Sequence, residues 1–367
     1  MNTNKQLNKG NNVKKAILSL LVVLSLSAAV VTPSHAYWDN QGGRWYWCEF
    51  GKFCKKKFDD VKFVNTLEEE SIRIRSNTIM GRLMEFGVYA KDPKSKSGPY
   101  TRMNNLFDFA DACLHRTDID EKLQLTAEAW KLYQLGELQF DSLSEPKAIE
   151  QVCFPSKPEL LAPRFMARRK LGTPEGVQAF YHALAHIEFI AIYLAWDILY
   201  RFRGLPEKFY QDWLQVAQEE AQHFNLIRDH LRKLGIDYGD LPAHQGLWEH
   251  AQDTSHDILA RLTIIPRCME ARGLDVTPAM IEKIRHLGDV DGVKILERIL
   301  EDEQQHVLFG SEWFYQQCEQ QQLAPEVTFK ALILKYFKNH KPKGPFNIEM
   351  RLNAGFTANE LAWLEDQ

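Results

Sequence analysis

This sequence has no strong excess of positive or of negative charge. Lysine and arginine number 45 and aspartate and glutamate 49, so the 367 residues carry a formal net charge of −4 at pH 7. A balance this even provides no general electrostatic attraction to nucleic acid, and no broad nucleic-acid-binding surface is predicted. Basic clusters at residues 164–170 and 335–344 are interpreted as solvated loops.

Cysteine is scarce too, with six residues in the whole chain. Cys48 and Cys54 lie close together, but their spacing fits no zinc-binding pattern. They could form a disulfide if this segment reaches an oxidising compartment. Cys268 and Cys318 fall inside helical patterns, where small buried side chains are expected.

Apolar runs of membrane length are missing after the N-terminus. Lys14 and Lys15 precede an apolar run at residues 16–31, and the tripeptide SHA that ends at Ala36 follows it. This order is typical of a secretory signal peptide, residues 1–36, cleaved after Ala36. The run is short for a membrane span, so we expect cleavage and export rather than a permanent transmembrane anchor.

Strand patterns are missing as well, and an all-α fold is predicted. Residues 37–103 are interpreted as an appended aromatic and basic segment with a linker at its end. Residues 104–160 are expected to form N-terminal helices. The main helical domain is expected to cover residues 161–367, including C-terminal helices.

Apolar residues at three- and four-residue spacing predict four helices of bundle length, with extra helices at both ends. In chain order, the long helices are expected over residues 173–202, 204–234, 244–272 and 292–320. Gly273 is expected to end the third helix, and Pro278 to begin a short helix of its own. A closing helix follows Pro325, and Thr357 with Glu360 forms a capping box.

The second and fourth long helices repeat one motif, an acidic residue followed by Glu-x-x-His. Glu220 and His223 are three residues apart, so both project from one face of their helix. Glu303 and His306 do the same on the fourth helix. Di-iron bundles use two such motifs together with one Glu from each of the other two helices.

The first and third helices each provide such a glutamate in an apolar stretch. Glu188 precedes Glu220 by 32 residues and Glu270 precedes Glu303 by 33, which indicates a duplicated half-site. These carboxylates and imidazoles suit two iron ions, and manganese or a mixed manganese–iron pair fits the same ligands. Four carboxylates also neutralise two divalent cations. The predicted metal ligands are Glu188, Glu220, His223, Glu270, Glu303 and His306.

Three further residues are candidates for contacts around these ligands. Glu219 and Asp302 each precede a Glu-x-x-His motif and are rotated by 100°, so each could hold a ligand His on a neighbouring helix. The alternative is that both are solvated acids. Tyr181 lies seven residues before Glu188 on the same face and is a candidate hydrogen-bonding or radical partner, with a packed aromatic as the alternative.

Other polar residues on these helices receive structural interpretations. His182 and His186 are interpreted as hydrogen-bonded core residues. His256 is expected to lie too far along the third helix to bind the same metals. Arg267, one turn before Glu270, could pair with a carboxylate or face the solvent.

Several stretches resemble a known family, among them "GTPEGVQAFYHALAHIEFIAIYLAWD", "GIDYGDLPAHQGLWE" and "KGPFNIEMRLNAGF". They look like an uncharacterised bacterial branch of the ferritin-like superfamily, catalogued as a domain of unknown function. The resemblance covers about Leu106 to the C-terminus. It implies a ferritin-like four-helix bundle with a di-iron carboxylate site whose ligands match the six residues above.

The resemblance implies no substrate and does not extend to residues 1–102. The branch is similar in outline to tRNA-hydroxylating ferritin-like enzymes, which offers a hydroxylase or oxidase by analogy. It also implies a cytoplasmic protein, in contrast to the signal-peptide pattern, and Met103 would be a natural start for the family's part of the chain.

Three functions follow, in this order of preference. The first is an oxygen-activating di-iron oxidoreductase that takes dioxygen and an unknown small or RNA-borne substrate. The second is a ferroxidase or another iron-handling protein, although the extra helices at both ends would obstruct a ferritin-style cage. The third is a non-catalytic helical interaction protein. Neither the substrate nor the oligomeric state is encoded in a recognisable pattern.

Overall fold

The computed structural model describes residues 35–39, 44–49, 52–54, 89–90, 101–141, 146, 153–162, 165–167, 169–244 and 246–366. By contacts, residues 26–103 form one unit and residues 104–367 belong to another. Residues 1–34 of the predicted signal peptide lie outside the described residues, and the predicted cleavage point falls within a strand that begins at His35.

Short antiparallel strands occupy part of the appended segment. Strands β1 (His35–Asp39), β2 (Arg44–Glu49) and β3 (Lys52–Cys54) form a sheet in that order, and β4 (Tyr89–Ala90) pairs with β5 (Thr101–Arg102). The expectation that the chain lacks strands was therefore wrong here. Tyrosine and tryptophan favour strands, and that signal was present in the aromatic residues of this segment. The side chains of Cys48 and Cys54 are not among those described, so their disulfide stays a prediction.

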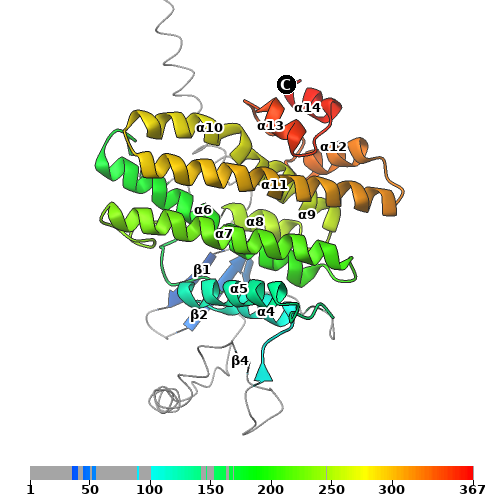
Figure 1. Cartoon of the computed structure of the whole chain (residues 1–367), viewed down its shortest axis with the longest axis horizontal. Helices are drawn as coiled ribbons and strands as arrows, with labels where there is room; N and C mark the ends of the chain where they lie inside the picture. The colour runs from blue at the N-terminus through cyan, green and yellow to red at the C-terminus, as the bar shows by residue number, and fades with distance from the viewer. Residues whose placement is uncertain are drawn as a thin grey trace, which may run out of the picture. The chain divides into compact units, whose positions relative to one another are not determined.

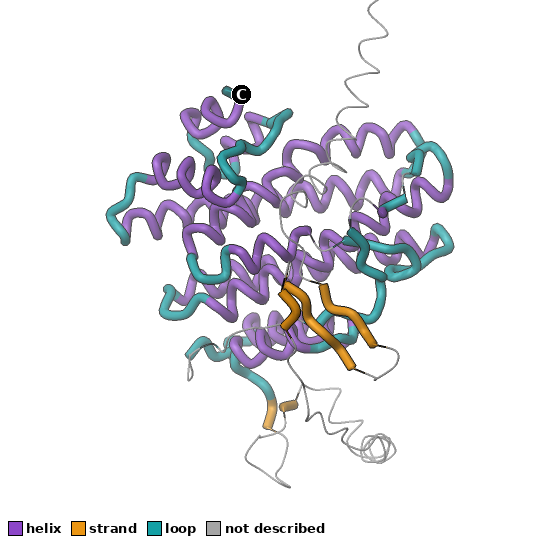
Figure 2. The backbone as a smooth tube through the Cα atoms, turned by 180° about the vertical axis from the view of Figure 1, so that it is seen from behind, coloured by secondary structure: helices purple, strands orange, loops and turns teal. Residues whose placement is uncertain are grey.

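The unit after residue 103 is helical, which confirms the all-α class for this part of the chain (Figures 1 and 2). It begins with α4 (Leu106–His115) and α5 (Ile119–Gln134), which are capped by Asn105 and Asp118. The side chain of Trp196 donates a hydrogen bond of 3.0 Å to Thr126 on α5, and Trp196 is fully buried. The first helices thus pack against the long helices that follow.

The first two long helices are α6 (Pro174–Arg201) and α7 (Glu207–Lys233). The Thr173 hydroxyl accepts from Gly176 N at 3.1 Å and Pro174 occupies the first turn, as the sequence predicted. Among the described helices, α6 alone is long and apolar enough to cross a membrane, and 83% of its apolar window is buried inside the protein. That burial is expected of a core helix.

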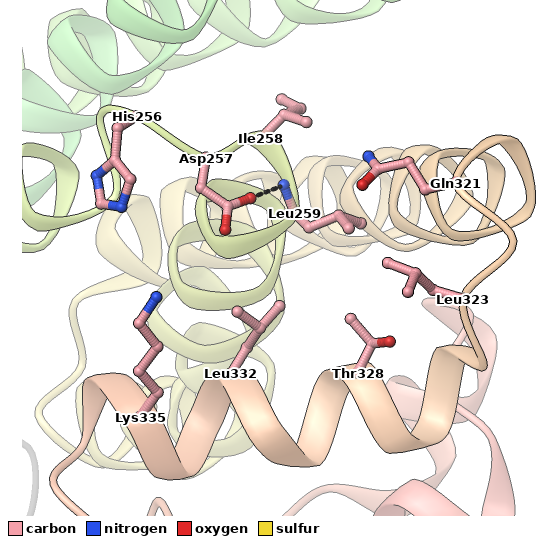
Figure 3. A pocket seen from close by; sticks show the side chains of 9 residues that line it. All are labelled: His256, Asp257, Ile258, Leu259, Gln321, Leu323, Thr328, Leu332 and Lys335. Carbon is pink, nitrogen blue, oxygen red and sulfur yellow. Dashed lines mark hydrogen bonds between the residues drawn. The ribbon is translucent and has the colours of Figure 1, made fainter.

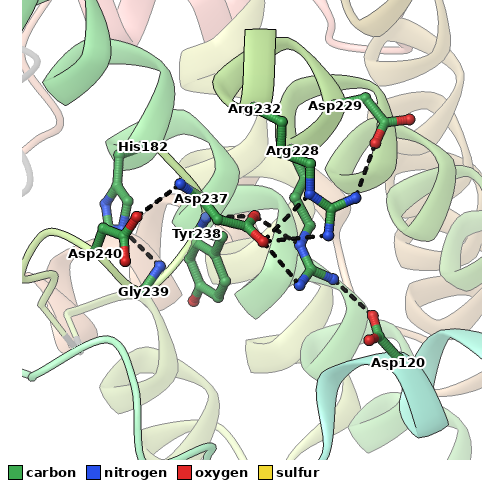
Figure 4. Close-up of polar contacts among 9 residues, drawn as sticks. All are labelled: Asp120, His182, Arg228, Asp229, Arg232, Asp237, Tyr238, Gly239 and Asp240. Atoms are coloured by element: carbon green, nitrogen blue, oxygen red, sulfur yellow. Dashed lines mark hydrogen bonds and ion pairs between the residues drawn. The ribbon is translucent and has the colours of Figure 1, made fainter. Parts of the chain in front are cut away.

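Arg228 on α7 holds the loop that follows this helix and also reaches α5. This side chain forms a fork with Asp237, at 2.9 and 3.2 Å, and also reaches Asp120 on α5 at 2.6 Å (Figure 4). On the other side of the loop, Gly239 N donates to His182 on α6 at 3.0 Å. These contacts fix the start of the connection between the two halves of the helical unit.

The third long segment differs from the prediction. It consists of α8 (Gly246–Asp253), α9 (Ile258–Ile264), a π-helical turn (Ile265–Glu270) and α10 (Ala271–His286). Gly273 does not end a helix and Pro278 does not begin one, because both lie inside α10. Local helix-breaking tendency is outweighed there by packing against the rest of the unit.

Pro266 accounts for the π-helical turn. Proline has no N–H to donate to the carbonyl four residues earlier, and its ring would clash with that carbonyl in a regular α-helix. The N–H of Ala271 instead reaches the carbonyl of Pro266, five residues back. Gly310 on α11 faces this turn, and a Cβ atom at Gly310 would lie 2.4 Å from Pro266 Cβ. The glycine thus permits close approach of α11 to the turn.

The fourth long helix is α11 (Val290–Gln320), followed by α12 (Pro325–Tyr336), α13 (Ile348–Asn353) and α14 (Ala358–Glu365). α11 runs antiparallel to α7: Asp212 pairs with Trp313, His223 with Asp302 and His230 with Asp289. The predicted capping box of α14 is confirmed, and Cys268 and Cys318 are buried as expected. The long helices lie side by side in Figure 1.

Substitution of Gly310 tests the close approach of α11 to the π-helical turn. Gly310→Ala is expected to lower the free energy of unfolding by about 1–3 kcal/mol, because the new methyl group overpacks against Pro266. Gly273→Ala is the matched control, since nothing lies within 4 Å of its Cβ position. It should raise stability by up to about 1 kcal/mol. Urea unfolding of both variants measures this, and equal stabilities would contradict the packing argument.

Candidate metal centre

Four helical segments direct acidic and imidazole side chains toward one point in the helical unit. Glu188 comes from the middle of α6, and α7 provides Glu220 and His223. Glu270 is the last residue of the π-helical turn. α11 provides Glu303 and His306. The apolar, periodic surroundings of each residue made all six identifiable from the sequence.

Four of these six residues form one compact group. The ligand atoms of Glu188, Glu220, His223 and Glu303 all lie within 4.8 Å of one another, close enough to hold a metal ion. His223 Nδ1 lies 3.4 Å from Glu188 Oε2. His306 is not in that group but adjoins it, with its Nδ1 3.8 Å from Glu303 Oε1. The structure therefore brings residues of both predicted half-sites together, but Glu270 is not part of this compact group.

Glu220 lies between the two imidazoles. One of its oxygens, Oε2, is 3.5 Å from His223 Nδ1, and the other, Oε1, is 3.1 Å from His306 Nδ1. The two imidazole centroids are 5.9 Å apart. A carboxylate placed in this way faces both imidazoles, as a ligand of a metal centre would.

Several inward-facing polar atoms of this group lack a hydrogen-bond partner among the described residues. They are both carboxylate oxygens of Glu220, Oε2 of Glu270, and Nδ1 of His223 and of His306. Buried polar atoms are normally paired, so a cluster of unpaired ones requires an explanation. Carboxylate oxygens and imidazole nitrogens that converge in this way fit a metal centre.

The outer nitrogens of both imidazoles are paired with carboxylates. His223 Nε2 lies 2.9 Å from Asp302 Oδ2, and His306 Nε2 lies 2.8 Å from Glu219 Oε2. Each contact crosses between α7 and α11, because the acidic residue precedes its own motif by one position and is rotated toward the neighbouring helix. An N–H donated to a carboxylate leaves Nδ1 free to bind a cation.

Comparison with known proteins gives a family but no activity. The model of a family described as "Protein of unknown function (DUF455)" matches residues 115–362. The chain belongs to this family. An "Uncharacterized protein" from Haemophilus influenzae is 43% identical over 241 residues, which are 63% of this chain and 83% of that protein. No solved structure matches. The family match includes all six residues of the centre.

The carboxyl groups of the centre titrate in opposite directions. Burial raises the pKa of Glu188 to about 7 and that of Glu270 to about 8, from an ordinary 4.5. Burial, reinforced by the charge of Glu220, also raises the pKa of Glu303. Burial acts to raise the pKa of Glu220, but the adjacent imidazoles of His223 and His306 lower it nevertheless. Without cations, protons therefore neutralise most of this buried charge.

The two imidazoles of the centre also hold their protons strongly. Burial alone would lower the pKa of His223 and His306, but hydrogen bonds to their carboxylate partners raise both well above the ordinary value. A divalent cation needs the neutral imidazole and the ionised carboxylate, so metal binding must release protons from this centre.

Tyr181 does not contact the centre in the way that was proposed for it. Its hydroxyl donates to Asp289 Oδ2 at 2.6 Å, and its ring packs edge-on against His230 at 4.5 Å. Asp289 also caps α11 through Gly292 N. Seven residues of helix place Tyr181 about 10 Å along α6 from Glu188, so facing the same side did not bring the two together. The packed-aromatic alternative describes it better.

The other polar residues considered above make contacts outside the centre. His186 contacts the hydroxyl of Tyr238 and the carbonyl of His244, each at 2.8 Å. Arg267 pairs with a carboxylate, Glu360, rather than facing solvent. His256 lies in a hollow of about 560 Å³ between the start of α9 and α12 (Figure 3), and none of the six centre residues lines it.

The two sides of the centre differ in exposure. Glu188, Glu220, His223 and His306 are buried, whereas Glu270 is only half-buried. The side chain of Glu303 remains 13% exposed. Glu270 and Glu303 are therefore the less buried members of the centre.

The raised carboxyl pKa values predict how metal-free protein responds to pH. From about pH 4.5 to about 8 the folded protein keeps protons on Glu188 and Glu270 that the unfolded chain has released. The free energy of unfolding should therefore fall as pH rises through this range. Urea unfolding in the presence of a chelator measures the slope. Glu188→Gln and Glu270→Gln should flatten it, and an unchanged slope in both would contradict the assignment.

The carboxylates behind the imidazoles are expected to strengthen metal binding. Asp302→Asn and Glu219→Gln should each weaken binding of a divalent metal by about 10–100-fold, because the outer N–H loses its charged acceptor. Glu301→Gln is the matched control for Asp302, since Glu301 also lies near Arg298 but its side chain is 77% exposed. Competition with a fluorescent chelator gives the affinities. Equal affinities in all three variants would refute the role.

Proposed function

We propose that residues 161–367 form a ferritin-like four-helix bundle that holds two iron ions, and that the protein is an oxygen-activating oxidoreductase. The observation that carries the proposal is the place of Glu220 between the inward nitrogens of His223 and His306. Manganese, or one manganese with one iron, fits the same ligands.

The ligand set balances the charge of the cations it would hold. Glu188, Glu220, Glu270 and Glu303 together provide four negative charges when ionised, which equal the charge of two divalent cations. Neutral imidazoles add none, provided that Asp302 and Glu219 hold their outer protons. A neutral centre is one that a helical core can bury without leaving an unpaired charge.

Each ligand has a defined task in this proposal. His223 with Glu188 would hold one ion, His306 with Glu303 and Glu270 would hold the other, and Glu220 would contribute to both. When bound, two ferrous ions would supply electrons for the reduction of dioxygen. Glu270 and Glu303 lie on the more exposed side, where a carboxylate can shift its binding mode to admit dioxygen and an organic substrate. Asp302 and Glu219 keep the imidazoles in one tautomer.

Metal content and oxygen uptake test the proposal together. Protein from an iron-replete host should contain about two irons per chain, and Glu220→Ala should lose both because it removes the bridge. Glu303→Ala should lose at least one. Glu301→Ala, an exposed acid on the same helix, is the control and should retain both irons.

Oxygen uptake separates an enzyme from an iron store. Reduced wild-type protein should consume dioxygen while its two irons stay bound, and uptake should rise when the organic substrate is present. Folded protein that takes up no ferrous iron would refute the metal centre. Accumulation of many irons per chain would contradict the oxidoreductase.

A further inference from the structure

The C-terminal segment packs around the stretch of helix that carries Glu270. α13 contacts both α10 and α11, and α14 packs on α12, which in turn contacts α9. In Figure 1 these short helices gather at one end of α11. Two buried charged contacts join this segment to the helix, one on each side of Glu270.

The first contact lies three residues before Glu270. Arg267 in the π-helical turn pairs with Glu360 of α14 at 2.7 Å, and both side chains are fully buried. Arg267 also donates to Ser311 at 3.1 Å and to Tyr315 at 3.2 Å on α11. Three phenylalanine rings lie 4.5–4.7 Å from its guanidinium group: Phe314, Phe329 and Phe356. The turn is therefore fixed to α11 and α14 at once.

The second contact lies just after Glu270. Arg351 of α13 binds Asp275 on α10 with two hydrogen bonds of 2.8 Å, and it also donates to the carbonyl of Ala271 at 3.3 Å. Asp275 accepts a further bond from Asn347 N at 2.9 Å. Arg272 donates to the carbonyl of Pro345 at 2.8 Å. The segment before α13 is thus tied to the first turn of α10.

Glu270 needs external support of this kind. It ends a π-helical turn, where the regular four-residue hydrogen bonding is interrupted, and its own Oε2 has no partner among the described residues. Burying an arginine–glutamate pair is a costly way to gain stability, since well-packed apolar side chains do so at least as well. The bidentate pair of Arg351 with Asp275 does, however, define direction and distance more strictly than apolar contact would.

We propose that Arg267, Glu360 and Arg351 are positioning residues that set the direction of the Glu270 carboxylate at the metal centre. The proposal rests on the proposed function, because it takes Glu270 to be a metal ligand. The C-terminal segment, called here the C-terminal clasp (residues 345–360), is then part of the centre without touching a metal. It holds the π-helical turn from both sides and so determines how one of the two ions is bound.

Cobalt(II) binding tests the clasp, because the visible spectrum of bound cobalt depends on the geometry of its ligands. Wild-type protein should bind two cobalt ions, and Glu270→Ala should alter the spectrum and weaken one ion. Arg351→Lys keeps the positive charge but loses the two parallel hydrogen bonds to Asp275. Glu360→Gln keeps the side-chain shape but loses the negative charge that pairs with Arg267. Each variant should reproduce part of the spectral change seen in Glu270→Ala. Each should also lower the affinity for one cobalt ion about tenfold, while the other ion binds as it does in wild type.

Arg228→Lys is the matched control. It breaks a comparable Arg–Asp fork elsewhere in the helical unit, so it should lower stability without altering the cobalt spectrum. Urea unfolding of each variant shows how much stability was lost, and Glu360→Gln decides the test if Arg351→Lys does not fold.

The outcomes separate the two proposals. Folded wild-type protein that binds no cobalt would overturn the metal centre and the clasp with it. Two bound cobalt ions with a changed spectrum in Glu270→Ala, but wild-type spectra and affinities in the clasp variants, would overturn the clasp alone.

Discussion

The cost of burying several carboxyl groups at one point is the constraint around which this helical unit is arranged. Glu188 and Glu220 lie in the packed interior, with Glu270 and Glu303 half-buried, and the two imidazoles beside Glu220 keep it ionised. Burial raises the pKa of Glu188 and Glu270, so these carboxyl groups hold their protons more strongly than free ones do. The long helices are needed to hold such an arrangement, since separated side chains in water would never adopt it.

The antiparallel alignment of α7 and α11 makes this arrangement specific. Residue numbers that rise along α7 fall along α11, so one alignment places Asp302 behind His223 and also Glu219 behind His306. A shift of α11 by one residue would rotate Asp302 and His306 by about 100° and break both contacts together. The hydrogen bond from Trp313 to Asp212, further along the same pair of helices, enforces that alignment outside the centre.

The grouping of Glu188, Glu220, His223 and Glu303 followed more directly from the sequence than the course of the third long segment did. Glu188 and the two Glu-x-x-His motifs were visible because helical periodicity is local and the flanking residues are apolar. The prediction for the third long helix was wrong. The course of this segment depends on the contact between Pro266 and Gly310, which are far apart in the chain. Tyr181 shares a helical face with Glu188, but its hydroxyl donates a hydrogen bond to Asp289 instead. Arg267 and Glu360 are separated by 93 residues, and no local pattern connects them.

The π-helical turn also changes how the two halves of its helix relate to each other. One additional residue in a turn advances everything after it by about 100° around the axis. The faces of α9 and α10 are therefore out of phase, so the stripe of residues that packs inward before Glu270 is not continued by the same stripe after it. Deleting one residue between Ile265 and Glu270 would not simply shorten this segment. It would turn α10, and Asp275 with it, away from Arg351 of α13.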